Sequence, residues 1–137
     1  MKIHELLKKK GSEVVTVQPT ATLETTIHRM KLGGTGYAVV STDGKHIDGI
    51  IAVRDFAYTL ADHHREIEHD TPVAKIMTRS VKTCSPQDTL KSVMQQMTQA
   101  KVLNFPVVED GVLRGIVSID DVVKYAVEEM ELESKVL

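Results

Sequence analysis

Apolar residues recur at helical spacing in three stretches of the chain. After residue 89 they stand at i, i+3, i+4 and i+7, on one face of a predicted helix: Leu90, Val93, Met94 and Met97. After residue 22 a second face contains Leu23, Ile27 and Met30. Near the C-terminus a third contains Val122, Val123, Ala126, Val127 and Met130. Thr22 and Thr89 directly precede the first two helices, and we expect them to cap the helix N-termini.

Short runs rich in β-branched residues lie between these helices and predict strands. The runs cover residues 14–17, 37–40, 81–84 and 105–108. Asp43-Gly44 and Asp110-Gly111 follow two of the runs and precede further apolar runs. Because Asp-Gly favours the tight turns of hairpins, each pair predicts two antiparallel strands.

The same order of elements occurs twice along the chain. Each copy reads β-α-β-β-α with a short helical lead-in, and the lead-in 3–7 matches 73–77. We assign the first repeat to residues 1–66 and the second to 67–137, in the α/β (α+β) class. A repeat of this size buries little core alone, so we expect the two copies to pack against each other.

Several motifs in this repeat resemble one family. The second copy contains Phe105-Pro106-Val107-Val108-Glu109-Asp110-Gly111, followed by Gly115-Ile116-Val117-Ser118-Ile119-Asp120-Asp121-Val122. This order resembles the cystathionine-β-synthase-type (CBS) domain, and the tandem arrangement resembles a Bateman module. The first copy departs from the family pattern at Ala38, where the family usually has Pro, and at Ala52, where it usually has Ser or Thr.

The resemblance implies a fold and a role. It implies two CBS repeats packed with pseudo-twofold symmetry, and a sensor that binds AMP, ADP or ATP, with S-adenosylmethionine and NAD-type molecules as alternatives. It also implies a homodimer that regulates an effector protein in trans, with no cofactor required for catalysis.

Ser118 and Asp121 are the central candidates for ligand binding. They stand where a strand gives way to a helix, whose free N–H groups favour a phosphate. The Ser118 hydroxyl adds a donor, and the Asp121 carboxylate suits the two hydroxyls of a ribose. The alternative is a helix cap formed by the two residues without a ligand.

The remaining candidates form an adenine slot and a second cleft. In the second copy the slot candidates are Thr83, Cys84, Phe105 and Pro106, with core packing as the alternative for each and the preferred one for Cys84. In the first copy the equivalents are Thr16, Tyr37 and Asp55, and Arg54 is either a phosphate ligand or a solvated side chain.

Composition narrows the partners. The 137 residues carry a net charge of −2, which gives no reason to expect nucleic acid or an anionic membrane as the main partner. A single cysteine and an N-terminus without a signal-peptide pattern predict a reducing, cytoplasmic location. His63, His64 and His69 match no tight zinc motif, so we expect no metal. We expect the basic run Lys8-Lys9-Lys10 to face water.

Three classes of function remain after these observations. The first is a regulatory module that binds an adenine nucleotide. The second is a ligand-free dimeric scaffold or interaction protein. The third is a hydrolytic enzyme, for which the sequence contains no Ser-His-Asp, Cys-His or P-loop signature. We therefore expect a protein that is not an enzyme.

Overall fold

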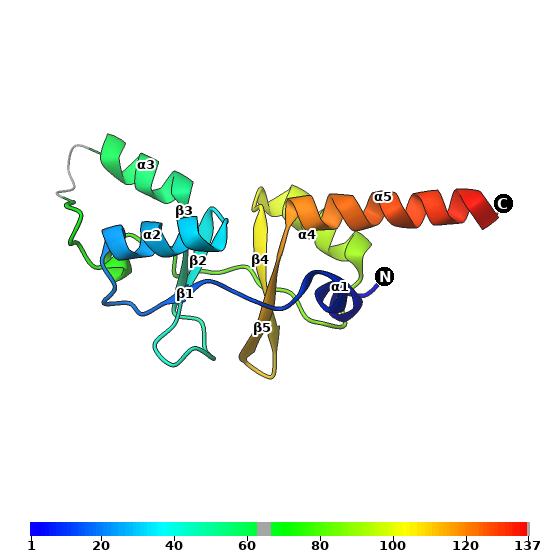
Figure 1. Cartoon of the computed structure of the whole chain (residues 1–137), viewed down its shortest axis with the longest axis horizontal. Coiled ribbons are helices and arrows are strands. Elements are labelled where there is room, and N and C mark those ends of the chain that lie inside the picture. The colour runs from blue at the N-terminus through cyan, green and yellow to red at the C-terminus, as the bar shows by residue number, and fades with distance from the viewer. Residues whose placement is uncertain (63–66, 137) are drawn as a thin grey trace. The chain divides into compact units, whose positions relative to one another are not determined.

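The computed structural model describes residues 1–62 and 67–136, which form two compact units. Unit 1 comprises Met1–Glu13 and Lys82–Leu137, and unit 2 comprises Val14–Val81. The elements of Figure 1 are, in chain order, α1 (Ile3–Lys10), β1 (Thr16–Val17), α2 (Leu23–Gly33), β2 (Tyr37–Val40), β3 (Gly49–Ala52), α3 (Val53–Ala61), the 3₁₀-helix η1 (Val73–Lys75), α4 (Leu90–Ala100), β4 (Asn104–Glu109), β5 (Val112–Ser118) and α5 (Ile119–Val136). None of the helices described within 1–62 and 67–136 is long and apolar enough to cross a membrane.

Unit 2 contains a three-stranded sheet in the order β1-β2-β3. Strand β1 is parallel to β2, and β2 is antiparallel to β3. Since Val40 pairs with Gly49, residues 41–48 form the connection between β2 and β3. The two antiparallel strands expected on either side of Asp43-Gly44 are therefore confirmed, although their connection is eight residues long. The Asp43 carboxylate accepts hydrogen bonds from the backbone N–H groups of Lys45 and His46, which organise a longer loop.

Unit 1 contains the antiparallel hairpin of β4 and β5. Asp110 and Gly111 both have positive φ, 51° and 77°, as a tight hairpin turn requires, so this turn is confirmed. The strand expected at 81–84 is reduced to one parallel bridge between Cys84 and Val107. The residues around Cys84 thus add only a short third segment to the hairpin.

The two helix caps agree with the sequence predictions, but the buried face of α2 differs from the predicted one. Thr22 and Thr89 accept hydrogen bonds from the N–H groups of Thr25 and Ser92, at 3.0 and 3.1 Å, which confirms both caps. In α4 the predicted face is buried at Leu90, Val93 and Met97. In α2, Ile27 is 47% exposed and Thr26 is fully buried. Its hydroxyl can be buried because it donates to the carbonyl of Thr22 at 2.8 Å.

Each unit combines one repeat with the lead-in of the other. In unit 1 the backbone hydrogen bonds that hold the lead-in are Leu90 N to Met1 O, Ile3 N to Asp88 O and His4 N to Pro86 O. In unit 2 the equivalent bonds are Leu23 N to Thr71 O, Val73 N to Ala21 O and Ala74 N to Pro19 O. The compact units therefore do not divide at the predicted repeat boundary between residues 66 and 67. The division into repeats stays a prediction about the sequence, as does their pseudo-twofold packing.

Two glycines at equivalent places in the repeats allow the lead-ins to approach. A Cβ atom on Gly115 would lie 2.9 Å from Cδ2 of Leu7, and one on Gly49 would lie 2.7 Å from Sδ of Met77 and 2.9 Å from the carbonyl oxygen of Thr78. Leu7 and Met77 match each other in the two lead-ins. In both units the strand after the hairpin connection thus carries a glycine because the other repeat's lead-in packs directly on it.

We expect Gly49→Ala to lower the free energy of unfolding by about 1–3 kcal/mol, the usual cost of adding a methyl group to a full site. The backbone carbonyl of Thr78 cannot rotate away, since it accepts from Ile50 N at 2.9 Å. Urea denaturation measures the change. Gly36→Ala in the same unit is the matched control, because its Cβ atom would have no neighbour closer than 3.6 Å. Equal effects of the two substitutions would contradict the close docking of the lead-in.

Candidate functional site

The site begins at the junction of β5 and α5 in unit 1. The backbone N–H of Ser118 donates to Oδ2 of Asp121 at 3.0 Å, and the Ser118 hydroxyl donates to the same atom at 2.9 Å. The Asp121 N–H is 3.2 Å from Oγ of Ser118. The Ile119 N–H donates to the Leu103 carbonyl at 2.8 Å. The cap that we considered as an alternative therefore exists, and it engages the hydroxyl and one carboxylate oxygen.

Lys10 completes this cluster from α1. Its ammonium group lies 2.6 Å from Oδ2 of Asp121 and 2.8 Å from the carbonyl oxygen of Ile116, to both of which it donates. The side chains of Lys10 and Asp121 are 20% and 24% exposed. The expectation that the whole basic run faces water is thus wrong for Lys10, because the end of α1 lies against β5 and the start of α5.

The spacing of residues in α1 could have predicted that Lys10 is partly buried, although it belongs to a basic run. Lys10 stands seven residues after Ile3, four after Leu6 and three after Leu7, and these three residues are the buried face of α1. A lysine on the buried face of a helix must reach an anion or a carbonyl. The partner itself was not predictable, because Asp121 is 111 residues away in the chain.

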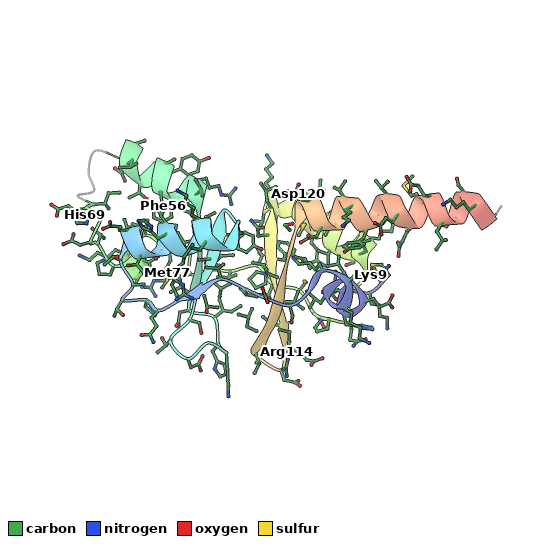
Figure 2. The ribbon with its side chains drawn as sticks, viewed as in Figure 1. Lys9, Phe56, His69, Met77, Arg114 and Asp120 are labelled. Atoms are coloured by element: carbon green, nitrogen blue, oxygen red, sulfur yellow. The ribbon has the colours of Figure 1, made fainter. Side chains whose placement is uncertain are left out.

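The electrostatics of Asp121 follow from this cluster. Partial burial alone would raise the pKa of its carboxyl group, but the hydrogen bonds from Lys10 and Ser118 and the charge of Lys10 outweigh burial, so the pKa lies below its ordinary value. The carboxylate is therefore ionised at neutral pH. Asp120, labelled at the start of α5 in Figure 2, adds a second acidic side chain beside it.

The slot residues of the second copy lie in the same unit. Pro106 accepts from Cys84 N at 3.0 Å, and Phe105 pairs with Val117, next to Ser118. Phe105 and Cys84 are 1% and 6% exposed and belong to the core, and burial raises the pKa of the Cys84 thiol to about 12. Thr83 is exposed. The hairpin and the segment around Cys84 thus bring these four residues together at the strands that lead to Ser118.

Unit 2 has an equivalent junction with different chemistry. The Ala52 N–H donates to Oδ2 of Asp55 at 2.7 Å, as Ser118 does to Asp121, but Ala52 has no hydroxyl. Arg54 is exposed, so its side chain is solvated. Tyr37 pairs with Ala52 and lies in the same sheet as Thr16. The helix that carries Lys10 in unit 1 is replaced here by the short η1 (Val73–Lys75), after which Thr78 pairs with Ile50 in a bridge.

The histidine-rich segment falls partly outside the described residues. His63 and His64 lie there, and Nδ1 of His69 lies 3.2 Å from Oε2 of Glu24. Within 1–62 and 67–136 no group of three or more His, Cys, Asp or Glu side chains is arranged to hold a metal ion.

Comparison with protein families identifies both repeats. The model of the CBS domain matches residues 5–62 and 73–128. The CBS domain-containing protein YhcV of Bacillus subtilis is 29% identical over 123 residues, which cover 90% of this chain and 84% of that protein. A 33.4 kDa protein from the ribosomal RNA operon of Thermofilum pendens is 30% identical over 128 residues, but the chain spans only 41% of its length.

Solved structures show the same fold. The CBS-domain protein ATU1752 of Agrobacterium tumefaciens is 32% identical with a TM-score of 0.84, over 92% of this chain and 99% of that one. The CBS domain structure NE2398 is 31% identical with a TM-score of 0.85, over 93% and 98%. More distant structures, at 23% and 20% identity, are PAE2072 of Pyrobaculum aerophilum in complex with AMP and the domain pair of MJ0100 in complex with 5′-methylthioadenosine and S-adenosyl-L-methionine.

We expect Lys10→Met to raise the pKa of Asp121, because burial remains while the hydrogen bond and charge of the ammonium group are lost. Carboxyl carbon shifts in an NMR titration measure it. A lowered pKa in the folded state means that this carboxylate stabilises the fold above its unfolded pKa of about 3.9 and that the contribution is lost as the pH falls through the folded value. Lys9→Met is the control, since Lys9 lies over the Tyr125 ring instead. An unchanged Asp121 pKa in Lys10→Met would refute the ion pair.

Proposed function

This chain belongs to the CBS domain family, and from that premise we propose that it is a regulatory module that binds an adenine nucleotide and acts on an effector protein in trans. The observation that carries the proposal is the cluster of Ser118, Asp121 and Lys10 at the end of β5. It joins an ionised carboxylate, a hydroxyl and an ammonium group at one junction. We propose a regulatory rather than a catalytic role, in a reducing, cytoplasmic location.

In this proposal Asp121 binds the ribose and Lys10 binds the phosphate. A carboxylate accepts hydrogen bonds from two neighbouring sugar hydroxyls but repels a phosphate. Asp120 and Asp121 together weaken the attraction of the helix N-terminus for an anion, so a nearby cation is needed. The side chain of Lys10 is long enough to turn from Asp121 to a phosphate once the ribose replaces it on the carboxylate.

The adenine is proposed to lie against the strands near Pro106 and Thr83. The backbone N–H and C=O of Cys84 already bond to Pro106 and Val108, so they offer the base edge little. Thr83 is exposed, and its hydroxyl can donate to or accept from the base. Phe105 and Cys84 then support the slot from the core rather than contact the base with polar atoms.

Two more distant relatives support an adenosyl ligand as the ligand class. One was solved with AMP and the other with 5′-methylthioadenosine and S-adenosyl-L-methionine. All three ligands share an adenine and a ribose and differ at the 5′ position. We propose AMP, ADP or ATP for this chain because Lys10 supplies a positive charge next to Asp121, and a phosphate is the 5′ group that such a charge favours. S-adenosylmethionine and NAD remain the alternatives within this class.

One observation favours a second candidate, a ligand-free scaffold. Lys10, Ser118 and Asp121 satisfy one another's hydrogen bonds without a ligand. A polar cluster of this kind can stabilise the packing of α1 against β5 and α5 without binding a ligand. In that case the protein would still pair with a partner through its exposed helix faces, but nucleotides would not stabilise it.

We also propose that the protein is a homodimer that uses α5. The predicted apolar face of this helix divides in the structure: Val122 is fully buried, while Val123, Val127 and Met130 are 48%, 46% and 68% exposed. These three residues stand at i, i+4 and i+7 and form one outer stripe. A stripe of this kind along a helix is typical of an interaction surface.

AMP at about a hundred times its dissociation constant should stabilise the protein by roughly 2.7 kcal/mol and raise Tm by roughly 4–10 °C.

Asp121→Ala should remove the tighter binding event in calorimetry, and Asp55→Ala should leave it largely intact. Lys10→Met should weaken AMP about tenfold or more but adenosine much less, because only AMP carries the phosphate. Arg54→Ala should show the same selectivity at the weaker site. Absence of a shift with every adenosyl ligand, in protein freed of bound nucleotide, would favour the scaffold.

Val127→Glu should convert the dimer to a monomer, since it places a charge in the middle of the outer stripe of α5. Sedimentation equilibrium at micromolar concentration measures the mass. Leu32→Glu is the matched control, because Leu32 is 89% exposed on α2 and lies outside the stripe. Wild-type protein that sediments as a monomer would disprove the dimer, and a dimer that survives Val127→Glu would place its interface elsewhere.

A further inference from the structure

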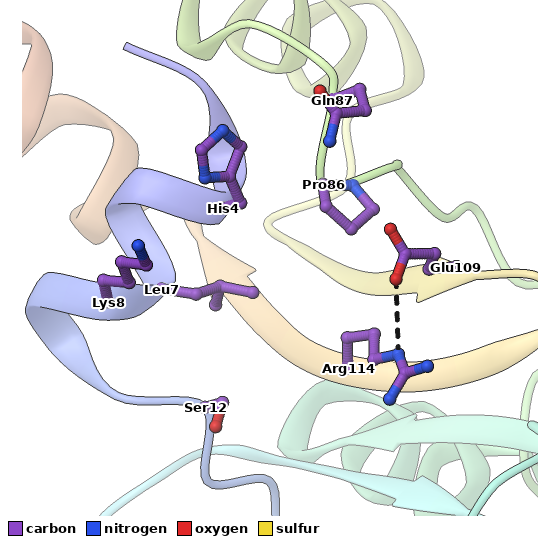
Figure 3. Close-up of a pocket in the computed structure, with 8 residues that line it drawn as sticks. All are labelled: His4, Leu7, Lys8, Ser12, Pro86, Gln87, Glu109 and Arg114. Atoms are coloured by element: carbon purple, nitrogen blue, oxygen red, sulfur yellow. Dashed lines mark ion pairs between the residues drawn. The ribbon is translucent and has the colours of Figure 1, made fainter.

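A hollow in unit 1 lies apart from the Ser118–Asp121 junction. It is bounded by α1, by the turn at Pro86 and Gln87, and by the tip of the β4–β5 hairpin (Figure 3), and its volume is about 350 Å³. Arg114 lies at the hairpin end of β5, whereas Asp120 lies beyond its other end (Figure 2). Ser118 stands four positions after Arg114 along β5, a distance of roughly 13 Å.

The walls of the hollow are held by the backbone. The N–H of His4 donates to the carbonyl of Pro86 at 3.0 Å, which joins α1 to the turn. The same turn is closed by Ser85 N, which donates to Oδ2 of Asp88 at 2.9 Å. Leu7 packs on Gly115 of β5 and is 9% exposed. A ligand therefore meets a preformed surface, which reduces the entropic cost of binding.

The chemistry of the hollow suits an anion with an apolar group. Figure 3 shows Lys8 and His4 on the α1 side and Arg114 on the hairpin side, with Leu7 extending from α1 toward the hairpin and Pro86 on the turn above Glu109. The side chains of Lys8 and Arg114 carry positive charge, and Ser12 and Gln87 add neutral polar groups. Leu7 and Pro86 present carbon atoms to whatever lies between the cations.

Glu109 also lines the hollow, and its carboxylate forms only a weak ion pair with Arg114. Its Oε1 atom is 3.7 Å from Nε of Arg114, and the two side chains are 45% and 51% exposed. An exposed pair at this distance contributes little to stability. A ligand carboxylate or phosphate can accept two parallel hydrogen bonds from the guanidinium group and can replace Glu109 there.

The other repeat serves as an internal comparison. In the repeat, Ala74 stands where unit 1 has His4, and Asp48, directly before Gly49, stands where it has Arg114. Thr78 is not a structural counterpart of Lys8, because the helical part of this lead-in is η1 (Val73–Lys75) and Thr78 pairs with Ile50 in a bridge. The carboxylate of Asp48 accepts from the backbone N–H of Thr42 at 2.7 Å and helps to order the 41–48 loop. The repeat fold therefore does not itself require cations at these places.

We propose that this hollow binds a small organic anion, a carboxylate or a phosphate monoester that carries a short apolar group. The anion lies between Lys8 and Arg114, and the apolar group lies on Leu7 and Pro86. This site is separate from the nucleotide site and does not depend on it. Because α1 also supplies Lys10, an occupant of the hollow contacts the helix whose Lys10 forms an ion pair with Asp121 of α5.

The test is an NMR titration of the full chain with phenyl phosphate, benzoate and inorganic phosphate at low ionic strength. We expect saturable amide shifts at Lys8, Gln87 and Arg114, with phenyl phosphate or benzoate tighter than inorganic phosphate because only they contact Leu7 and Pro86. Prior saturation with adenosine, which carries no phosphate, should leave these shifts in place. Shifts no larger than those from sodium chloride at equal ionic strength, or shifts confined to the Ser118–Asp121 junction, would overturn the proposal.

Three variants make the titration decisive. Lys8→Met combined with Arg114→Gln should weaken phenyl phosphate on the order of tenfold or more, whereas Lys91→Met combined with Arg29→Gln removes the same charge elsewhere and should have little effect. Glu109→Gln should tighten binding roughly two- to fivefold, since it frees Arg114, and a gain of affinity cannot result from misfolding. Equal losses in both double variants, or weaker binding in Glu109→Gln, would show that the hollow is not the site.

Discussion

The docking of each lead-in segment on the other repeat is the constraint on which the rest of this structure depends. The hairpin of unit 1 has too small a surface to close a core alone. Ile3 and Leu6 of α1 are fully buried against it and lie in one cluster with Phe105 and Val117. Three backbone hydrogen bonds hold the start of this lead-in against residues 86–90, and Gly115 of β5 lets Leu7 pack directly on the strand.

This docking also sets the charges of the candidate site. It brings Lys10 to Asp121, lowers the pKa of that carboxyl group and forms one wall of the hollow at the hairpin tip. In unit 2 the helical part of the lead-in is only η1 (Val73–Lys75), and Thr78 then pairs with Ile50 of β3 instead of continuing a helix toward the Ala52–Asp55 junction. The two junctions thus differ mainly through the lead-ins they receive, together with the exchange of Ser118 for Ala52. A difference between the two repeats in ligand binding would follow from that exchange of segments.

Sequence reasoning succeeded where the cause was local and failed where it was not. The caps at Thr22 and Thr89 and the turn at Asp110-Gly111 depend on a few neighbouring residues, and each is confirmed. The same signal at Asp43-Gly44 correctly predicted the antiparallel strands β2 and β3 but not the length of their connection, because the register leaves eight residues between Val40 and Gly49. Ile27 was assigned to the buried face of α2 on spacing alone, but the neighbours of this helix select Thr26 instead.

By itself, the sequence determined the repeat, the order of its elements and the family, because periodic apolar positions and turn residues act over short distances. It also placed Ser118 and Asp121 at a junction of strand and helix. Only the tertiary structure decided that Lys10 lies on Asp121, and that His4, Lys8 and Arg114 line one hollow. Lys10 and Asp121, like His4 and Arg114, are about a hundred positions apart in the chain. Their partners are chosen by which surfaces pack together, and no local pattern in the chain records that choice.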